Sequence, residues 1–277
     1  MKKYSLITKS AVAAAGVAAT AGAVAVAIAP GKASAGAKAP FYGRYFAHRG
    51  LHTGDGVAPE NSLTAFRMAA KEGYGVELDV HITKDDQIVV FHDDDLLRMT
   101  GKEGKIEDFT YEQLLELRLA GSGEKIPLLT EVLEVIGGVG PIVLELKTTR
   151  RRRDLCEQTY ALLQTYPGDV CIESFDPLLV RWFRVNAPEY IRGQLACPPW
   201  EYGENAKPVL SFLLGNCLLN FLGRPQFIAY KIGPKPVTVR LAEAMGAMRV
   251  CWTSHCLKDK EGNDAVIFEH YRPGLYL

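Results

Sequence analysis

The segment GVELDVHITKDDQIVVFHDD (residues 75–94) places acids and histidines among residues that favour a buried strand. Glu77 and Asp79 lie two positions apart, so on a strand both carboxylates point to the same face. Glu145, in the run PIVLELK, repeats this arrangement with Lys147 two residues later. Carboxylates this close raise one another's pKa or share a cation, and hard oxygen ligands suit Mg²⁺ or Ca²⁺. A buried Glu145–Lys147 pair, with Glu77 capping a neighbouring turn, is the simpler alternative, but three acids at converging strand ends favour a metal site.

Two histidines each follow an apolar run, His48 in FAHRG and His92 in VVFHDD. Imidazoles titrate near neutral pH, so the pair offers a general acid and a general base. Arg49 and Lys147 carry the positive charge that binds an oxyanion such as phosphate. A divalent ion would neutralise the same oxyanion as its charge builds. The set predicts phosphodiester cleavage better than glycosidic or amide hydrolysis, and the sequence has no serine nucleophile elbow, P-loop or HExxH motif.

The connection between Val80 and Gln87 is too short for a crossover helix. We expect a hairpin with its turn at Asp85-Asp86, although a slip by one residue would reverse the faces. An extended link followed by a returning strand is the other possible geometry. In both, Asp79 and His92 meet at one end, with His81 beside the site rather than in it. The expected hairpin register pairs Thr83 with Ile88, His81 with Val90, and Asp79 with His92.

Short apolar runs alternate with amphipathic segments along the rest of the chain. Runs that are apolar on both faces are typical of a parallel sheet covered by helices. We therefore expect a (β/α)₈ barrel, whose site lies at the carboxyl ends of the strands. A doubly wound sheet is the alternative, although HRGLH is not the glycine-rich phosphate turn that such a sheet usually carries. The expected strands are Arg44–Ala47, Gly75–Val80, Gln87–Phe91, Pro141–Lys147, Asp169–Phe175, Ile191–Ala196, Gln226–Lys231 and Met248–Thr253, and the expected helices are Ser62–Lys71, Tyr111–Leu119, Leu129–Ile136, Arg152–Thr165, Leu178–Asn186, Val209–Phe221 and Val237–Met245.

The composition fits one large globular domain over residues 41–277. Lys plus Arg and Asp plus Glu are both 32, so no basic field indicates a nucleic-acid partner. Hydrophobic residues make up 48% of the chain, which is ample for a core. The six cysteines include no CxxC pair, and several lie in apolar runs, so we expect reduced core thiols rather than disulfides or structural zinc.

Residues 1–38 differ from the rest of the chain. Three lysines precede an uncharged run of Ala, Val and Gly over residues 11–29, and Ala33-Ser34-Ala35 follows it. This pattern is typical of a cleaved export signal or, because the run is nearly long enough to span a bilayer, of a retained membrane anchor. Either places residues 41–277 outside the cytoplasmic membrane, since the lysines stay on the cytoplasmic side. A cytoplasmic protein with a disordered leader is the alternative.

A second apolar stretch, PVLSFLLGNCLLNFLG at residues 208–223, is too short and too interrupted by polar residues to span a membrane. We expect a helix packed on the barrel. A lipid-facing insertion is the alternative.

After Phe41 the chain resembles the glycerophosphodiester phosphodiesterase family, whose barrel is of the phospholipase-C-like type. Motifs in the family's order carry the resemblance, above all HRG, PEN, ExD…HD and ExK. Two positions depart from it: His81 stands where the family commonly has Gln, and Ser254-His255 follows Trp252-Thr253, where Val-Asn is frequent. The matching pieces are HRG (48–50), PENS (59–62), TAF (64–66), GVELDVHITKDDQIVVFHD (75–93), LLRMTG (96–101), IPLLTEVL (126–133), VLELK (143–147), SFDP (174–177) and CWT (251–253).

The resemblance implies one divalent ion, Mg²⁺ or Ca²⁺, and hydrolysis of glycerophosphodiesters to sn-glycerol 3-phosphate and an alcohol such as choline. A lysophospholipase D-like activity on membrane lipids is the rival activity, and a non-catalytic phosphate-binding module is the rival class. Glu60, in PEN, is expected near the metal or the first histidine, and Trp252 supports the pocket. Carried onto this chain, the roles are His48 and His92 as the acid–base pair, Glu77, Asp79 and Glu145 as metal ligands, and Arg49 and Lys147 as phosphate-binding residues.

Overall fold

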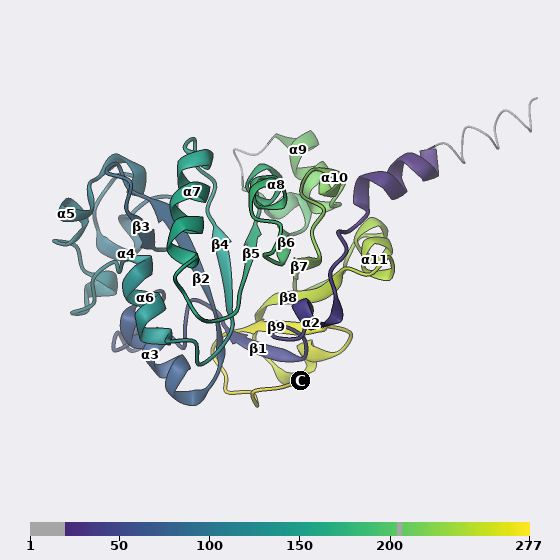
Figure 1. Ribbon diagram of the computed structural model, residues 1–277. Helices are drawn as coiled ribbons and strands as arrows, with labels where there is room; N and C mark the ends of the chain where they lie inside the picture. The colour runs from purple at the N-terminus through teal and green to yellow at the C-terminus, as the bar shows by residue number, and fades with distance from the viewer. Residues whose placement is uncertain (1–19, 204–206) are drawn as a thin grey trace, which may run out of the picture.

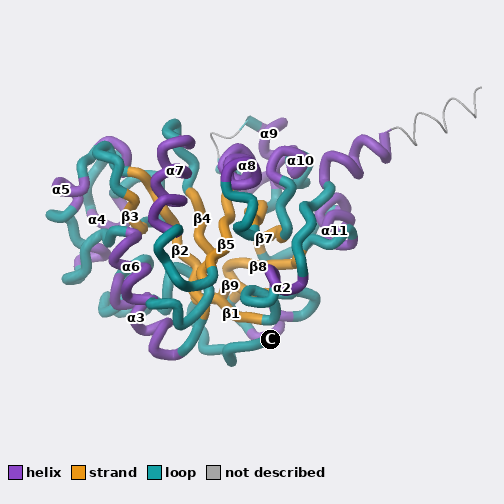
Figure 2. Tube along the Cα trace, viewed as in Figure 1, coloured by secondary structure: helices purple, strands orange, loops and turns teal. Residues whose placement is uncertain are grey.

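The computed structural model describes residues 20–203 and 207–277. Eight parallel strands close into a barrel with helices around it (Figures 1 and 2). Their order around the barrel is β1-β9-β8-β7-β6-β5-β4-β2, and a β1–β2 pairing closes the ring. The expected (β/α)₈ barrel is therefore confirmed. The barrel strands are β1 (Arg44–Ala47), β2 (Gly75–Ile82), β4 (Ile142–Leu146), β5 (Val170–Ser174), β6 (Arg192–Ala196), β7 (Phe227–Lys231), β8 (Met248–Ser254) and β9 (Ala265–Phe268).

The predicted set of eight strands was wrong in one member. The run Gln87–Phe91 forms β3 (Ile88–Val90), which pairs antiparallel with the outer end of β2 and lies outside the ring. The missing barrel strand is β9, between β8 and β1, which was not predicted. A four-residue run, AVIF, closely follows another strand without a helical pattern between them, so it gave no alternation to detect.

The predicted hairpin exists, but its register was wrong by one residue. His81 pairs with Val89, not Val90. The cause is the turn: Asp86 adopts a left-handed conformation (φ 65°), which makes a three-residue loop between Thr83 and Gln87. The Thr83 N–H donates to the Gln87 carbonyl, and the Gln87 N–H donates to Thr83 Oγ1, both at 2.9 Å.

Helices cover the outside of the barrel and were mostly predicted. In α3, Ser62 caps the first turn by accepting from the Ala65 N–H, and Gly73 ends the helix with φ 79°. Two predicted helices were too long, since 111–119 forms only the short α5, and 209–221 splits into α9 and α10. The helices are α2 (Ala35–Lys38), α3 (Leu63–Glu72), α4 (Leu97–Thr100), α5 (Tyr111–Leu114), α6 (Leu129–Ile136), α7 (Arg152–Leu163), α8 (Pro177–Asn186), α9 (Pro208–Gly215), α10 (Asn220–Gly223) and α11 (Val237–Ala244), with 3₁₀ turns at Ile106–Asp108, Leu119–Gly121, Pro199–Glu201 and Leu257–Lys260.

Strand alternation divides the core into two layers. Side chains such as Leu78 and Leu144 point outward and pack under the helices. Their neighbours, such as Val143 and Ile267, fill the barrel interior. The interior is so tight that a Cβ on Gly193 would lie 2.0 Å from the Phe227 ring. Apolar residues thus fill the barrel interior toward the amino ends of the strands. At the carboxyl ends, the last inward-facing residue of several strands is polar.

The N-terminal segment packs on the barrel from about residue 24 onward. Ile28 is buried among residues of β6, β7 and α11, and Arg224 donates to the carbonyls of Val26 and Ala29. Residues 1–19, which hold much of the predicted signal or anchor, lie outside the described residues. Among the residues that the structure describes, no helix has the length and hydropathy needed to cross a membrane. The six cysteines are free thiols, and the five other than Cys256 are buried, which agrees with the predicted core positions.

Candidate active site

The inward-facing polar residues gather at the carboxyl ends of the strands, where barrel enzymes build their sites. His48 follows β1, Glu77 and Asp79 lie on β2, and Glu145 lies on β4, with Lys147 just after it. All five side chains are buried. The parity that puts Val143 inside the barrel also puts Glu145 and Lys147 there. The strands therefore carry these charges to one place, as their spacing predicted.

Glu77, Asp79 and Glu145 form a compact group of acids, each offering an oxygen within 4.8 Å of the others. Lys147 Nζ lies 3.3 Å from Asp79 Oδ1 and 3.1 Å from Glu145 Oε1. Burial, which Lys147 offsets only in part, together with the charge of Asp79, raises the pKa of Glu145 to about 7. Burial and the neighbouring acids also raise the pKa of Glu77 well above its usual range. Asp79 differs: burial opposes its ionisation, but Lys147, His92 and Arg49 outweigh that effect and lower its pKa.

These three acids fit a divalent cation. The donors are hard oxygens from rigid strands, which suits Mg²⁺ or Ca²⁺. Burial and the neighbouring acids oppose ionisation of Glu77 and Glu145, and a bound cation would favour their charged forms. The cluster is therefore a candidate site for a divalent cation.

Arg49 connects the acids to the PEN segment. Its backbone N–H donates to Glu77 Oε2 (2.9 Å), and its Nη1 donates to Glu60 Oε1 (2.9 Å). Its Nε is buried without a hydrogen-bond partner and lies 3.8 Å from Asp79 Oδ2. Asn61, the neighbour of Glu60, donates from Nδ2 to Asp79 Oδ2 (2.9 Å) and has φ 57°. Asn61 was quoted in the motif but not predicted as a site residue.

His48 is held by Glu269, at the end of β9. Its Nδ1 lies 2.7 Å from Glu269 Oε2, and its Nε2 lies 3.9 Å from Glu77 Oε2. The carboxylate fixes the ring so that Nε2 faces the acids. Burial lowers the pKa of His48, although Glu269 works in the opposite direction. Glu269 was missed because its strand was missed; the signal was the alternation Ala265, Ile267, Glu269.

His92 has the same arrangement with a local partner. Its Nδ1 lies 2.7 Å from Asp93 Oδ1, which is possible because both residues lie beyond the end of β3. Asp93 also accepts from Arg98 Nε (2.5 Å), and Arg98 donates to Glu60 through both terminal nitrogens. A chain of charged contacts thus runs from His92 through Arg98 and Glu60 to Arg49. Sequence reasoning set aside a tautomer-fixing role for Asp93, because adjacent residues on a strand face opposite ways, and predicted no role for Arg98.

A fourth acid, Glu173 on β5, faces the same interior and was not predicted. It is 1% exposed, and its Oε2 has no hydrogen-bond partner. Burial and the charges of Glu145 and Asp79 raise its pKa well above the usual range. Glu173 points into the barrel because it lies two residues after Cys171, which also points inward.

A pocket of about 70 Å³ opens over these residues. Phe175 and Trp252 form an aromatic wall, with ring centroids 5.9 Å apart in an edge-to-face contact. Trp252 is fixed by a hydrogen bond from its Nε1 to the Ala196 carbonyl (3.2 Å). All nine predicted site residues lie in or directly around this pocket. Its lining is His48, Arg49, Glu77, His92, Glu145, Glu173, Phe175, Leu195, Trp252 and Ile267.

Comparison with known proteins agrees with this geometry. The sequence profile of the "Glycerophosphoryl diester phosphodiesterase family" matches residues 48–269. YhdW of Bacillus subtilis (strain 168) is 38% identical over 152 residues, which cover 51% of this chain and 61% of YhdW. Human Lysophospholipase D GDPD1 is 38% identical over 123 residues, which cover 40% of this chain and 38% of that protein. The chain thus spans less than two thirds of the length of these curated relatives.

A solved structure shares the fold. The phosphodiesterase of Oleispira antarctica, in complex with the product sn-glycerol-3-phosphate, superposes with a TM-score of 0.66 at 24% identity, covering 82% of this chain and 93% of that one. The family match extends over most of the present chain, and its two ends are His48 and Glu269, the pair joined by a hydrogen bond. This chain belongs to the glycerophosphoryl diester phosphodiesterase family.

Proposed function

We propose that this protein hydrolyses glycerophosphodiesters to sn-glycerol 3-phosphate and an alcohol. The observation that carries the proposal is the paired arrangement of His48 and His92. Each ring has its Nδ1 2.7 Å from a carboxylate oxygen, and both histidines line the pocket beside Glu77 and Glu145. Two imidazoles oriented in this way suit two proton transfers at one phosphorus centre.

The residues divide the work as follows. Arg49 and Lys147 bind the phosphodiester oxygens, and their positive charges stabilise the transition state. One imidazole takes the proton of the attacking hydroxyl, and the other gives a proton to the departing alkoxide oxygen. Mg²⁺ or Ca²⁺ held by Glu77, Asp79 and Glu145 would supply further neutralisation of the phosphate charge. Phe175 and Trp252 would shield one side of the pocket from water.

The test measures glycerol 3-phosphate release from glycerophosphocholine by the purified protein. We expect EDTA to abolish the activity and Mg²⁺ or Ca²⁺ to restore it. His48→Ala and His92→Ala should each lose at least about 100-fold in kcat, the contribution of a general acid or base. His81→Gln, which replaces another histidine near the site, is the matched control. Full turnover in either alanine variant would refute the scheme.

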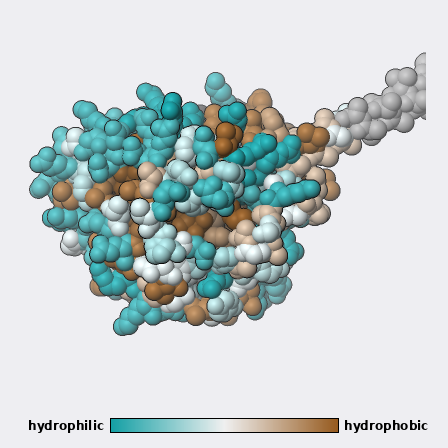
Figure 3. Space-filling model, in the orientation of Figure 1, coloured by the Kyte–Doolittle hydropathy of each residue, from teal (hydrophilic) through white to brown (hydrophobic). Residues whose placement is uncertain are grey.

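A lipid substrate is the second candidate, favoured by exposed apolar side chains beside the pocket. Trp200 is 78% exposed, Val209 73% and Phe212 54%. They lie in the connection that leaves the carboxyl end of β6, on the same rim as the pocket, and hydrophobic side chains gather around α9 in Figure 3. Such a patch is typical of contact with a membrane or partner. Turnover of lysophosphatidylcholine above that of glycerophosphocholine, reduced by Phe212→Ser, would favour this candidate.

We also propose that residues 11–29 associate with a membrane and keep the barrel outside the cytoplasmic membrane. The support is the composition of this segment, which is almost wholly Ala, Val and Gly and carries no charged residue. Flotation of the full chain with liposomes, compared with a chain lacking residues 1–19, tests the association. Equal recovery of both in the soluble fraction would contradict it.

A further inference from the structure

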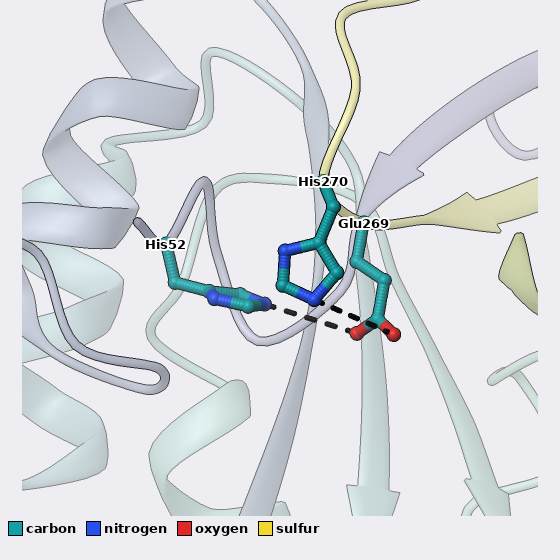
Figure 4. A group of neighbouring side chains, drawn as sticks. All are labelled: His52, Glu269 and His270. Carbon is teal, nitrogen blue, oxygen red and sulfur yellow. Dashed lines mark ion pairs between the residues drawn. The ribbon is translucent and has the colours of Figure 1, made fainter. Parts of the chain in front are cut away.

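Four of the six histidines surround a single carboxylate at the end of β9. Glu269 holds His48 on its Oε2, and three other imidazoles approach from the solvent side. His52 Nε2 lies 3.8 Å from Oε2, and His270 Nε2 lies 3.9 Å from Oε1. Figure 4 shows His52 and His270 directing ring nitrogens at this carboxylate from two separate segments. The proposed function assigns no role to His52, His255 or His270.

A third imidazole, that of His255, contacts the same carboxylate. Its Nε2 lies 2.7 Å from Glu269 Oε1, and its ring centroid lies 5.7 Å from that of His270. The rings of His52 and His270 meet edge to face at 5.1 Å. Three segments therefore contribute: the loop after β1, the loop after β8, and the end of β9.

The spacing suits a transition-metal ion. Ligand atoms of His52, Glu269 and His270 all lie within 4.8 Å of one another. Zinc with ligand bonds of about 2.0–2.1 Å needs tetrahedral ligands about 3.3 Å apart. The observed 3.8 Å and 3.9 Å separations exceed that by about 0.5 Å, which small side-chain rotations close. His270 is 57% exposed, so its ring is free to make this adjustment.

The chemistry of the donors separates this group from the acid cluster. Glu77, Asp79 and Glu145 offer oxygen alone, which favours Mg²⁺ or Ca²⁺. Imidazole nitrogens with one carboxylate favour Zn²⁺ or a similar borderline ion. We propose that His52, Glu269 and His270 form a second metal site that takes a Zn²⁺-class ion.

The site is coupled to His48 through Glu269. An ion that ligates this carboxylate competes for the lone pairs and negative charge that orient the His48 ring. Occupancy therefore loosens His48 and lowers turnover. This second step rests on the proposed function, whereas ion binding itself does not.

Binding is tested with Co²⁺ as a spectroscopic probe of Zn²⁺-type sites. The protein is titrated with Co²⁺ in saturating Mg²⁺, so that the acid cluster is occupied, and visible absorption reports tetrahedral nitrogen ligation. We expect one Co²⁺ per chain, displaced by Zn²⁺. His270→Ala and His52→Gln should each weaken affinity at least tenfold, the lower end of the effect of altering a metal's surroundings. His81→Gln, which removes an imidazole elsewhere, should bind as the unaltered protein does.

Thermal unfolding of each variant distinguishes loss of a ligand from loss of the fold. Absence of a tetrahedral Co²⁺ spectrum, or the same affinity in folded His270→Ala, would overturn the site. The coupling is tested by adding Zn²⁺ to the enzyme with glycerophosphocholine in Mg²⁺. Zn²⁺ should lower the turnover of the unaltered protein. His270→Ala should need at least tenfold more Zn²⁺ for the same loss of turnover. Equal sensitivity in both would overturn the coupling. An inactive protein that still binds Co²⁺ through these histidines would refute the proposed function and leave the second site standing.

Discussion

Replacing His81 with Gln should make the protein more resistant to acid. His81 is 8% exposed, and its Nε2 lies 3.5 Å from the His92 carbonyl oxygen. Burial, with the nearby positive charge of Lys147, lowers the pKa of His81 to about 3. The folded protein therefore keeps this ring neutral at pH values where the unfolded chain protonates it.

The sign follows from proton linkage. The unfolded chain takes up a proton near pH 6.5 and the folded chain only near pH 3, so the free energy of unfolding falls as pH drops below 6.5. Each pH unit in this window is worth about 1.4 kcal/mol. At pH 5 the His81 contribution is therefore about 2 kcal/mol, and at pH 8 it is close to zero. Gln cannot be protonated, so the variant escapes this loss.

The assay is urea unfolding of the unaltered protein and His81→Gln at pH 8 and pH 5, with EDTA present throughout. Groups that titrate alike in both proteins cancel in the difference between them. The variant should gain about 2 kcal/mol relative to the unaltered protein between the two pH values. The pH 8 difference is the internal control, because it contains only the packing change. A stability difference that is the same at both pH values would refute the reasoning, since it would mean that the folded protein accepts the proton.

Three further outcomes follow from particular contacts. Glu269→Gln should lower kcat by about 100- to 10,000-fold with KM little changed, because a neutral amide orients the ring without stabilising its positive charge; steady-state kinetics test this, and a change confined to KM would contradict it. Asp264→Asn should cost about 1 kcal/mol at pH 7, because burial opposes ionisation of Asp264 but hydrogen bonds from the half-exposed Arg249 outweigh it and lower the pKa; in urea unfolding this cost is fully present above pH 4 and should shrink as pH falls below 4, so a cost that does not change with pH would be evidence against the ion pair. Gly193→Ala should destabilise the barrel by about 1–3 kcal/mol, because its Cβ would lie 2.0 Å from the Phe227 ring, and an unchanged melting temperature would show that the ring has room to move.

Much of the site could be predicted because alternate residues of a strand face the same side of the sheet. Glu77 and Asp79 share a face in any register, and parallel strands bring their carboxyl ends to one rim. What depended on loops could not be predicted. The hairpin register turned on the left-handed conformation of Asp86, which no alternation pattern encodes. Asp93 reaches His92 only because the chain leaves the strand there, so the rule that neighbours face opposite ways does not apply.

The one substantial gap, β9, explains why Glu269 and the histidines around it were missed. Without that strand, nothing in the sequence placed Glu269 on the inner face of the barrel. The carboxylate that contacts His48 was therefore missed. So was its grouping with His52 and His270. The two catalytic histidine candidates also differ in how they are held. Asp93 holds His92 from the adjacent position in the chain, whereas Glu269 holds His48 from 221 residues away. Orientation of His48 therefore depends on closure of the barrel between β9 and β1, and any change that separates these two strands should reduce activity before it unfolds the protein.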